Sequence, residues 1–243
     1  MRVQLIGLAI ATTVFATGVA FAQGSPASPT KPGQLFAGAA FTSWSSEDGL
    51  RGWRPYPGGT ATSTSLASPV LAWSLSAGVF VTTRWQISGE LSARRARSAS
   101  ITETVQTPFE SWELSSQYTS RERLGSVAIG RSVGGRSAWA AQILGAFTIS
   151  RRSQSLTGRT GWYRYPGGET TTDRPDLLTE VTRFGVSGGA DVLRTIGHGL
   201  AAGAVVRVHL INPGPRPVAP GAIPPGSGSR VILIGGGVRW GAR

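Results

Sequence analysis

The chain contains few residues of the types that carry out covalent or metal chemistry. It has no cysteine and only two histidines, His198 and His209. The lack of cysteine excludes disulfide scaffolds, thiolate catalysis and cysteine-ligated zinc. No Gly-x-Ser-x-Gly segment is paired with a plausible general base, and the sequence His-x-Ser is absent. We therefore expect a protein that is not an enzyme and that binds no metal and no cofactor.

Arginine is the residue type with the clearest chemical potential. The net charge is +12, from 24 basic and 12 acidic residues, and Lys31 is the one lysine. Guanidinium groups bind carboxylates and phosphates in a bidentate manner. Charged residues nevertheless make up only 15% of the chain, against about 25% in ordinary soluble domains. The arginines are therefore expected to act at particular places rather than over a uniformly charged surface.

The N-terminus indicates export. Arg2 precedes an uncharged apolar stretch over 5–20, and Ala20-Phe21-Ala22 forms a small-x-small cleavage site. We expect residues 1–22 to be a signal peptide and 23–33 to be a polar segment before the folded domain, 34–243; an uncleaved membrane anchor is the alternative. Nucleic acid is the usual partner of a basic chain. An exported chain does not meet it routinely, so phosphates of anionic lipids are the better candidates.

The body of the chain alternates apolar with small or polar residues in steps of two, which predicts β-strands. This alternation covers 71–82, 85–92, 138–149, 183–192, 202–210 and 232–240. Strands near 35–44 and 117–131 complete a set of eight, and we expect a bulge in the latter.

The connections between these strands alternate in length. Short connections at 82–84, 133–135 and 194–199 alternate with long ones at 45–69, 98–116, 152–177 and 212–229. Short turns at one end and long loops at the other are typical of transmembrane β-barrels, and in hydrocarbon only a closed sheet pairs every backbone group. We predict an all-β fold, an eight-stranded antiparallel up-and-down transmembrane β-barrel. Trp85, Trp139 and Trp240 are expected on its lipid face at the turn end, as an aromatic girdle, with Trp44 and Trp73 toward the other girdle.

With this pattern, and with the closing segment Arg230-Val231-Ile232-Leu233-Ile234-Gly235-Gly236-Gly237-Val238-Arg239-Trp240, the chain resembles the small eight-stranded outer-membrane β-barrels of Gram-negative bacteria, the OmpA/OmpX type. The resemblance implies location in the outer membrane, with 23–33 as a periplasmic segment. For this chain we expect no peptidoglycan-binding domain after the barrel. The resemblance also implies the barrel assembly machinery as a partner. That machinery usually reads a terminal aromatic residue, for which Trp240 stands in before Gly241-Ala242-Arg243.

The predicted strands place charged residues in two groups. An eight-stranded barrel is filled by side chains, and buried charges must pair. We therefore expect a lumenal charge network that plugs the barrel, with a gate for small ions as the alternative. Its members are Glu90, Arg94, Gln142, Arg183, Asp191, Arg207, His209 and Arg239. The second group is an outer basic rim suited to lipopolysaccharide phosphates, or else a solvated charge belt that includes Glu122. Its members are Arg94, Arg95, Arg97, Arg121, Arg123, Arg151 and Arg152.

Two long connections share a motif. Residues 52–59 and 161–168 both read Gly-Trp-x-x-Tyr-Pro-Gly-Gly, which indicates a duplication of four strands. The loop motif residues Trp53, Tyr56, Trp162 and Tyr165 either pack each loop on itself or form a surface for a glycan or protein. The preferred function is thus a non-enzymatic outer-membrane barrel that supports the envelope or presents its loops. A small-solute or ion channel and a soluble exported β-barrel binding protein are the alternatives.

Overall fold

The computed structural model describes residues 31–46, 59–63, 69–133, 139–197, 199–212 and 230–241. Within these ranges the regular structure is entirely β, and no helix is long and apolar enough to cross a membrane. The expected signal peptide lies outside the described residues, as does most of the 23–33 segment. The strands are β1 (Leu35–Ser46), β2 (Gly59–Ser63), β3 (Val70–Phe80), β4 (Trp85–Arg94), β5 (Arg97–Gln106), β6 (Ser111–Val133), β7 (Trp139–Tyr165), β8 (Gly168–Arg174), β9 (Leu177–Gly197), β10 (Leu200–Ile211) and β11 (Arg230–Gly241).

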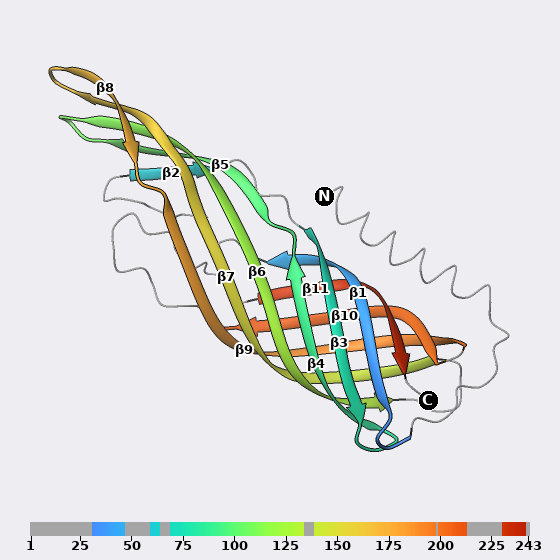
Figure 1. Cartoon of the computed structure of the whole chain (residues 1–243). Helices are drawn as coiled ribbons and strands as arrows, with labels where there is room; N and C mark the ends of the chain where they lie inside the picture. The colour runs from blue at the N-terminus through green and yellow to red at the C-terminus, as the bar shows by residue number, and fades with distance from the viewer. Residues whose placement is uncertain are drawn as a thin grey trace.

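Eight of these strands close into a ring in which every neighbouring pair is antiparallel. The order around the ring is β1, β3, β4, β6, β7, β9, β10 and β11. The first and last strands close it, in a register that runs from Phe36 opposite Gly241 to Ser46 opposite Val231. Closure pairs the edges that an open sheet would expose. The predicted eight-stranded antiparallel up-and-down barrel is confirmed, and Figure 1 shows its strands crossing at a tilt.

The side chains alternate between the two faces of the barrel wall as predicted. In β3, Leu71 and Trp73 are exposed, whereas Ala72 and Ser74 are buried. The same alternation recurs in most of the other five segments. The exceptions are 202–204 and 235–237, which are all of intermediate exposure, and Ala140, which is exposed between two partly exposed neighbours. The exposed side is strongly apolar, although exposed apolar side chains are costly in water. Its large members include Leu75, Ile87, Leu91, Val127, Ile129, Ile143, Phe147, Ile149, Phe184, Val186, Leu210, Ile234 and Val238.

Two of the expected long loops are strands instead. The β6, β7 and β9 strands run for 23, 27 and 21 residues, well past the ring. The 98–116 connection consists of β5 and the start of β6, and the 152–177 connection contains the end of β7 and all of β8. These segments and β2, which pairs with β5, project from one end of the barrel (Figure 1). Apolar alternation ends at the ring because the outward side chains beyond it are polar, while the backbone pairing continues.

The bulge expected in the strand near 117–131 is not found there, because those residues pair with β4 and β7 without a register shift. A bulge lies just outside that range, and its extra residue belongs to β7. The β6–β7 register shifts between Ser115 and Gln117, where β7 carries Gly158 with φ of 61°. Glycine adopts this left-handed conformation without steric cost.

The expectation for Trp44 was wrong: its side chain is completely buried and packs with Ala72 and Leu233 inside the barrel. Trp73 does lie on the exposed side.

Candidate functional site

The barrel interior holds a group of paired charges near the turn end. The Arg207 guanidinium lies 3.0 Å from the Glu90 carboxylate and 2.5 Å from the Asp191 carboxylate. Arg239 donates to the other oxygen of Asp191 at 2.8 Å and also donates to Gln142. These residues come from β4, β7, β9, β10 and β11, so the contacts cross the barrel. Two carboxylates and two guanidinium groups balance in charge, as burial requires. The structure therefore brings together five residues of the predicted lumenal network.

A second group surrounds Glu122 on β6. Its carboxylate lies 2.8 Å from Arg152, 3.0 Å from Arg183 and 3.8 Å from Arg94, with all four side chains buried. Ser150 donates a further hydrogen bond to Glu122 at 2.9 Å. The assignment of Glu122 to a solvated belt was wrong, because the pleat turns it inward between Arg121 and Arg123. Three guanidinium groups meet one carboxylate here, which makes Glu122 the central residue of the group.

A third ion pair lies beyond the ring, in the projecting strands. Arg159 on β7 donates to both oxygens of Glu103 on β5, at 3.2 and 2.9 Å. Both side chains are buried, and Arg159 also donates to the carbonyl of Pro175. Neither residue was singled out from the sequence. The signal that could have found them is the alternation of Ala99, Ile101, Glu103 and Val105 within β5, all of which are buried.

His209 belongs to a short polar chain in the interior. The Thr148 hydroxyl contacts His209 Nδ1 at 3.3 Å and donates to Ser187 at 2.9 Å. Ser187 is the central residue of Gly185-Val186-Ser187-Gly188-Gly189, which fits Gly-x-Ser-x-Gly, and it lies opposite His209 in the β9–β10 register. That segment runs straight through β9, whereas a catalytic nucleophile elbow needs a sharp strand-to-helix turn. The expectation that no such serine has a histidine nearby was therefore wrong, because the strand pairing brings His209 beside Ser187. The straight strand fits hydrogen bonding within the barrel interior.

One cavity lies among the charged side chains inside the barrel. This cavity of about 30 Å³ is bordered by Glu90, Asp191, Arg207 and Arg239, together with small residues such as Gly38 and Ser76. Its volume is about that of one water molecule. Elsewhere in the described ranges, no group of three histidine, aspartate or glutamate side chains is placed to hold a metal ion.

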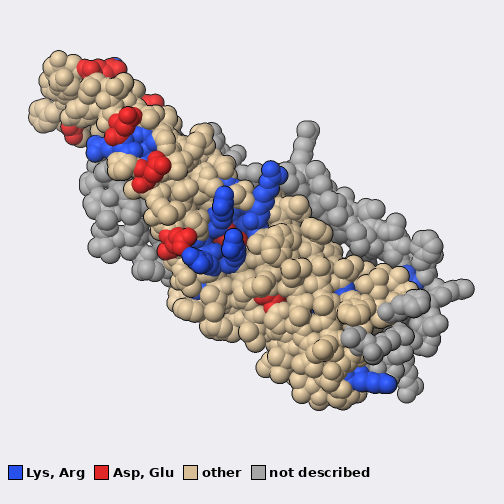
Figure 2. Space-filling model, viewed as in Figure 1, with Lys and Arg blue, Asp and Glu red and all other residues tan. Residues whose placement is uncertain are grey.

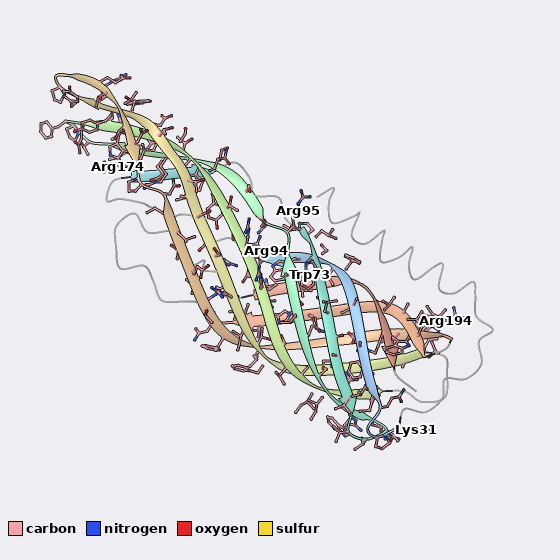
Figure 3. All side chains as sticks on the ribbon, viewed as in Figure 1. Lys31, Trp73, Arg94, Arg95, Arg174 and Arg194 are labelled. Carbon is pink, nitrogen blue, oxygen red and sulfur yellow. The ribbon has the colours of Figure 1, made fainter. Side chains whose placement is uncertain are left out.

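The predicted outer rim divides between the two faces of the wall. Arg95, Arg121, Arg123 and Arg151 are exposed and are named here the outer arginine cluster. The expectation was wrong for the other three, because the pleat places them on the inner face; they are Arg94, Arg97 and Arg152, at 5%, 4% and 1% exposure. Figure 2 shows basic side chains gathered midway along the molecule, and Figure 3 labels Arg94 and Arg95 at the outer end of β4.

The outer arginine cluster contains an unfavourable contact. Arg123 and Arg151 are direct cross-strand partners in the β6–β7 register, and like charges in that position repel. One carboxylate offsets this in part, since Glu180 lies 2.7 Å from Arg151 in an exposed pair. On the side of the cluster that faces the short turns, the next outward residues of these strands are apolar, and they include Leu91, Val127 and Ile149.

The three girdle tryptophans lie on the outer face near the short turns. Trp85 and Trp240 are 45% and 55% exposed, and Trp139 is partly exposed. Arg131 lies over the Trp85 ring at 5.7 Å and Arg194 over the Trp139 ring at 5.9 Å. This end therefore pairs amphipathic rings with cations, a combination that suits a headgroup layer.

The outermost hairpin carries one copy of the repeated motif. Trp162 stacks under Arg164, which pairs with Glu169 at 2.9 Å. Tyr165 stacks on Tyr163, whose hydroxyl donates to Glu110 at 2.6 Å. This hydrogen bond to a carboxylate raises the pKa of the Tyr163 phenol above its ordinary value. The other copy, with Trp53 and Tyr56, lies outside the described residues, so the two are not brought together here.

A closed ring with an apolar outer face, a charged interior and long strands projecting at one end is the architecture of a small eight-stranded outer-membrane β-barrel. No protein-family model matches the chain, and no curated protein sequence does either. Two solved structures are similar in fold. Ail, the attachment invasion locus protein of Yersinia pestis, has a TM-score of 0.43 and 7% identity over 86% of this chain and 99% of that one. The outer membrane protein OprG of Pseudomonas aeruginosa has a TM-score of 0.45 and 14% identity over 88% and 98%.

Proposed function

We propose that this chain is a non-enzymatic outer-membrane β-barrel protein that acts through the strands projecting outside the cell. The observation that carries the proposal is the inverted polarity of the ring. Large apolar side chains such as Leu91, Val127 and Phe147 are exposed, whereas charged side chains such as Glu122 are buried. This inversion is unfavourable in water and favourable in a bilayer, where no backbone group is left unpaired. Export by a cleaved signal peptide at 1–22 belongs to the same proposal.

In this proposal the barrel is plugged rather than open. The ion pairs of Glu90, Asp191 and Glu122 cross the interior, and the cavity among the first two holds about 30 Å³. A conducting pore needs a continuous water-filled path. The charges therefore stabilise the barrel and fill it, and the function lies at the surface.

The outer arginine cluster is proposed to bind lipid phosphates of the outer leaflet, those of lipopolysaccharide. The direct opposition of Arg123 and Arg151 favours this role, because a phosphate between two guanidinium groups relieves their repulsion and accepts bidentate hydrogen bonds from them. The cluster also lies at the right level, immediately above the apolar band. The neighbouring Glu180 forms an ion pair with only one of these two arginines, Arg151.

Membrane fractionation with gel migration tests the proposed function. The full chain should appear in the outer-membrane fraction and should migrate faster on a denaturing gel when it is not heated, because a closed barrel resists detergent until it is boiled. Recovery of the native chain in the soluble fraction, without detergent, would overturn the proposal.

A further inference from the structure

A cleft in the projecting strands has no role in the ring or in its interior. Its volume is about 300 Å³, and it is bordered by Glu110, Trp112, Leu114, Tyr163, Thr170, Thr171, Thr172 and Arg174. The residues come from β6, β7, β8 and the turn before β6. Figure 3 labels Arg174 at the end of β8 nearest the barrel. The cleft is thus about ten times the volume of the cavity inside the barrel.

The strand register explains why this place is hollow. Trp112, Tyr163 and Thr170 follow one another across three neighbouring strands and form one row. Leu114, Gly161 and Thr172 form the next row, and Gly161 contributes no side chain between its two neighbours. A Cβ atom at Gly161 would overlap the carbonyl of Glu113. Glycine at 161 therefore lets β6 lie close to β7. The cleft is bordered by the aromatic residues Trp112 and Tyr163 on one side and by the hydroxyls of Thr170 and Thr172 on the other.

The charged side chains around the cleft differ in whether they have a partner within the protein. The Glu110 carboxylate already accepts the hydroxyl of Tyr163 at 2.6 Å and so holds that ring in place. Arg174 lies opposite Arg159 in the register, but the Arg159 guanidinium is turned to Glu103. No carboxylate of the described residues forms an ion pair with Arg174. The charged group left to meet a ligand is therefore a guanidinium, which prefers a planar carboxylate.

We propose that the cleft between β6, β7 and β8 binds a saccharide unit that carries a carboxylate. The Tyr163 ring, which is partly exposed and packs against the buried cluster of Val105, Trp112 and Leu114, offers an apolar surface to the C–H face of a sugar ring. The hydroxyls of Thr170 and Thr172 both donate and accept, which matches sugar hydroxyls, and Arg174 pairs with the carboxylate. A concave apolar wall with a few placed polar groups is the usual form of a small-ligand site. This inference rests on the proposed function, which places these strands outside the cell.

Binding of two matched disaccharides tests the proposal. The probes are cellobiouronic acid and neutral cellobiose, which differ in one carboxylate, titrated calorimetrically into the full chain refolded in detergent micelles. Cellobiouronic acid should bind about tenfold more tightly than cellobiose, a difference typical of one charge-assisted pair. Arg174→Gln should remove that preference. Arg164→Gln makes the same change of charge on the same hairpin, at a residue engaged with Glu169, and should leave it intact.

The outcomes separate this inference from the proposed function. Each protein is first checked for faster migration of the unheated sample, so that only closed barrels are titrated. A closed barrel that binds neither disaccharide, that binds both equally, or that keeps its preference after Arg174→Gln overturns the cleft proposal alone. A chain that never shows the faster migration contradicts the proposed function itself.

Discussion

The Glu122 carboxylate and the Arg152 guanidinium are 2.8 Å apart, and their side chains are 0% and 1% exposed. Because Arg94 and Arg183 contact the same carboxylate, Glu122 compensates more than one cation. Glu122→Gln would leave those cations buried beside a neutral group. We predict that it lowers the free energy of unfolding by about 3–5 kcal/mol, the usual cost of breaking a buried pair, as measured by urea titration of the refolded protein.

The matched control for Glu122 is Glu180→Gln, which removes a carboxylate from an exposed pair with Arg151. We expect little change in stability from it, since solvent screens exposed pairs. Equal effects of the two substitutions would contradict the assignment of Glu122 to the interior.

A charge on the apolar face should be costly at the middle of the barrel. Val127 is 65% exposed on β6, between the exposed residues Arg123 and Arg131 that mark the two ends of the band. Val127→Arg should destabilise the folded barrel in lipid vesicles by about 2–4 kcal/mol, the range for arginine at a bilayer midplane. Ile196→Arg, near a short turn, should cost about 0–1 kcal/mol. A neutral effect of Val127→Arg would show that this face does not contact hydrocarbon.

The proposal of a plugged barrel predicts electrical silence. The purified chain should produce no channel steps in a planar bilayer, and neither should Glu90→Ala, because the other side chains at that level still fill the interior. Discrete steps that appear in the native protein and change in size with Glu90→Ala would support the gate alternative and overturn the plugged barrel.

Charge reversal in the outer arginine cluster should weaken lipid binding. With each arginine worth about 1 kcal/mol near an anionic surface, Arg121→Glu together with Arg123→Glu should weaken lipopolysaccharide binding about tenfold or more. The measurement is the phosphate of lipopolysaccharide that copurifies per barrel. Arg84→Glu with Arg131→Glu makes the same change at the turn end and should leave it unaltered. If lipopolysaccharide copurifies undiminished with the Arg121→Glu, Arg123→Glu variant, the proposal that the outer arginine cluster binds lipid phosphates is overturned.

The sequence was most informative for strands whose outward face carries apolar side chains. In β3, β4 and β10 the alternation of Leu71, Leu91 and Val206 with small or polar residues predicted both the strand and the side of the wall on which each residue lies. The closed ring followed from the number and spacing of such strands. This signal is strong because lipid-facing positions exclude charge.

The sequence was misleading where outward residues become polar. Beyond Arg123 and Arg151 the outward side chains of β6 and β7 are polar, although Leu114, Tyr118 and Leu156 are buried on the other face. The continuation of these strands was therefore interpreted as loops. The arginines near the rim were treated as one group, although parity along the strand separates Arg94 from Arg95 and Arg151 from Arg152. The central place of Glu122 depends on side chains from β4, β7 and β9 converging on it, which no local pattern contains.

The central claim is an outer-membrane barrel whose β5–β8 strands face outward, and cysteine labelling tests it most directly. The chain contains no cysteine, so Thr171→Cys in β8 and Thr83→Cys in a short turn each provide a single thiol. A bulky maleimide that does not cross the outer membrane is applied to intact cells and to permeabilised cells. The account predicts that Thr171→Cys is labelled in intact cells and that Thr83→Cys is labelled only after permeabilisation. Labelling of Thr83→Cys in intact cells, with Thr171→Cys protected, would contradict it.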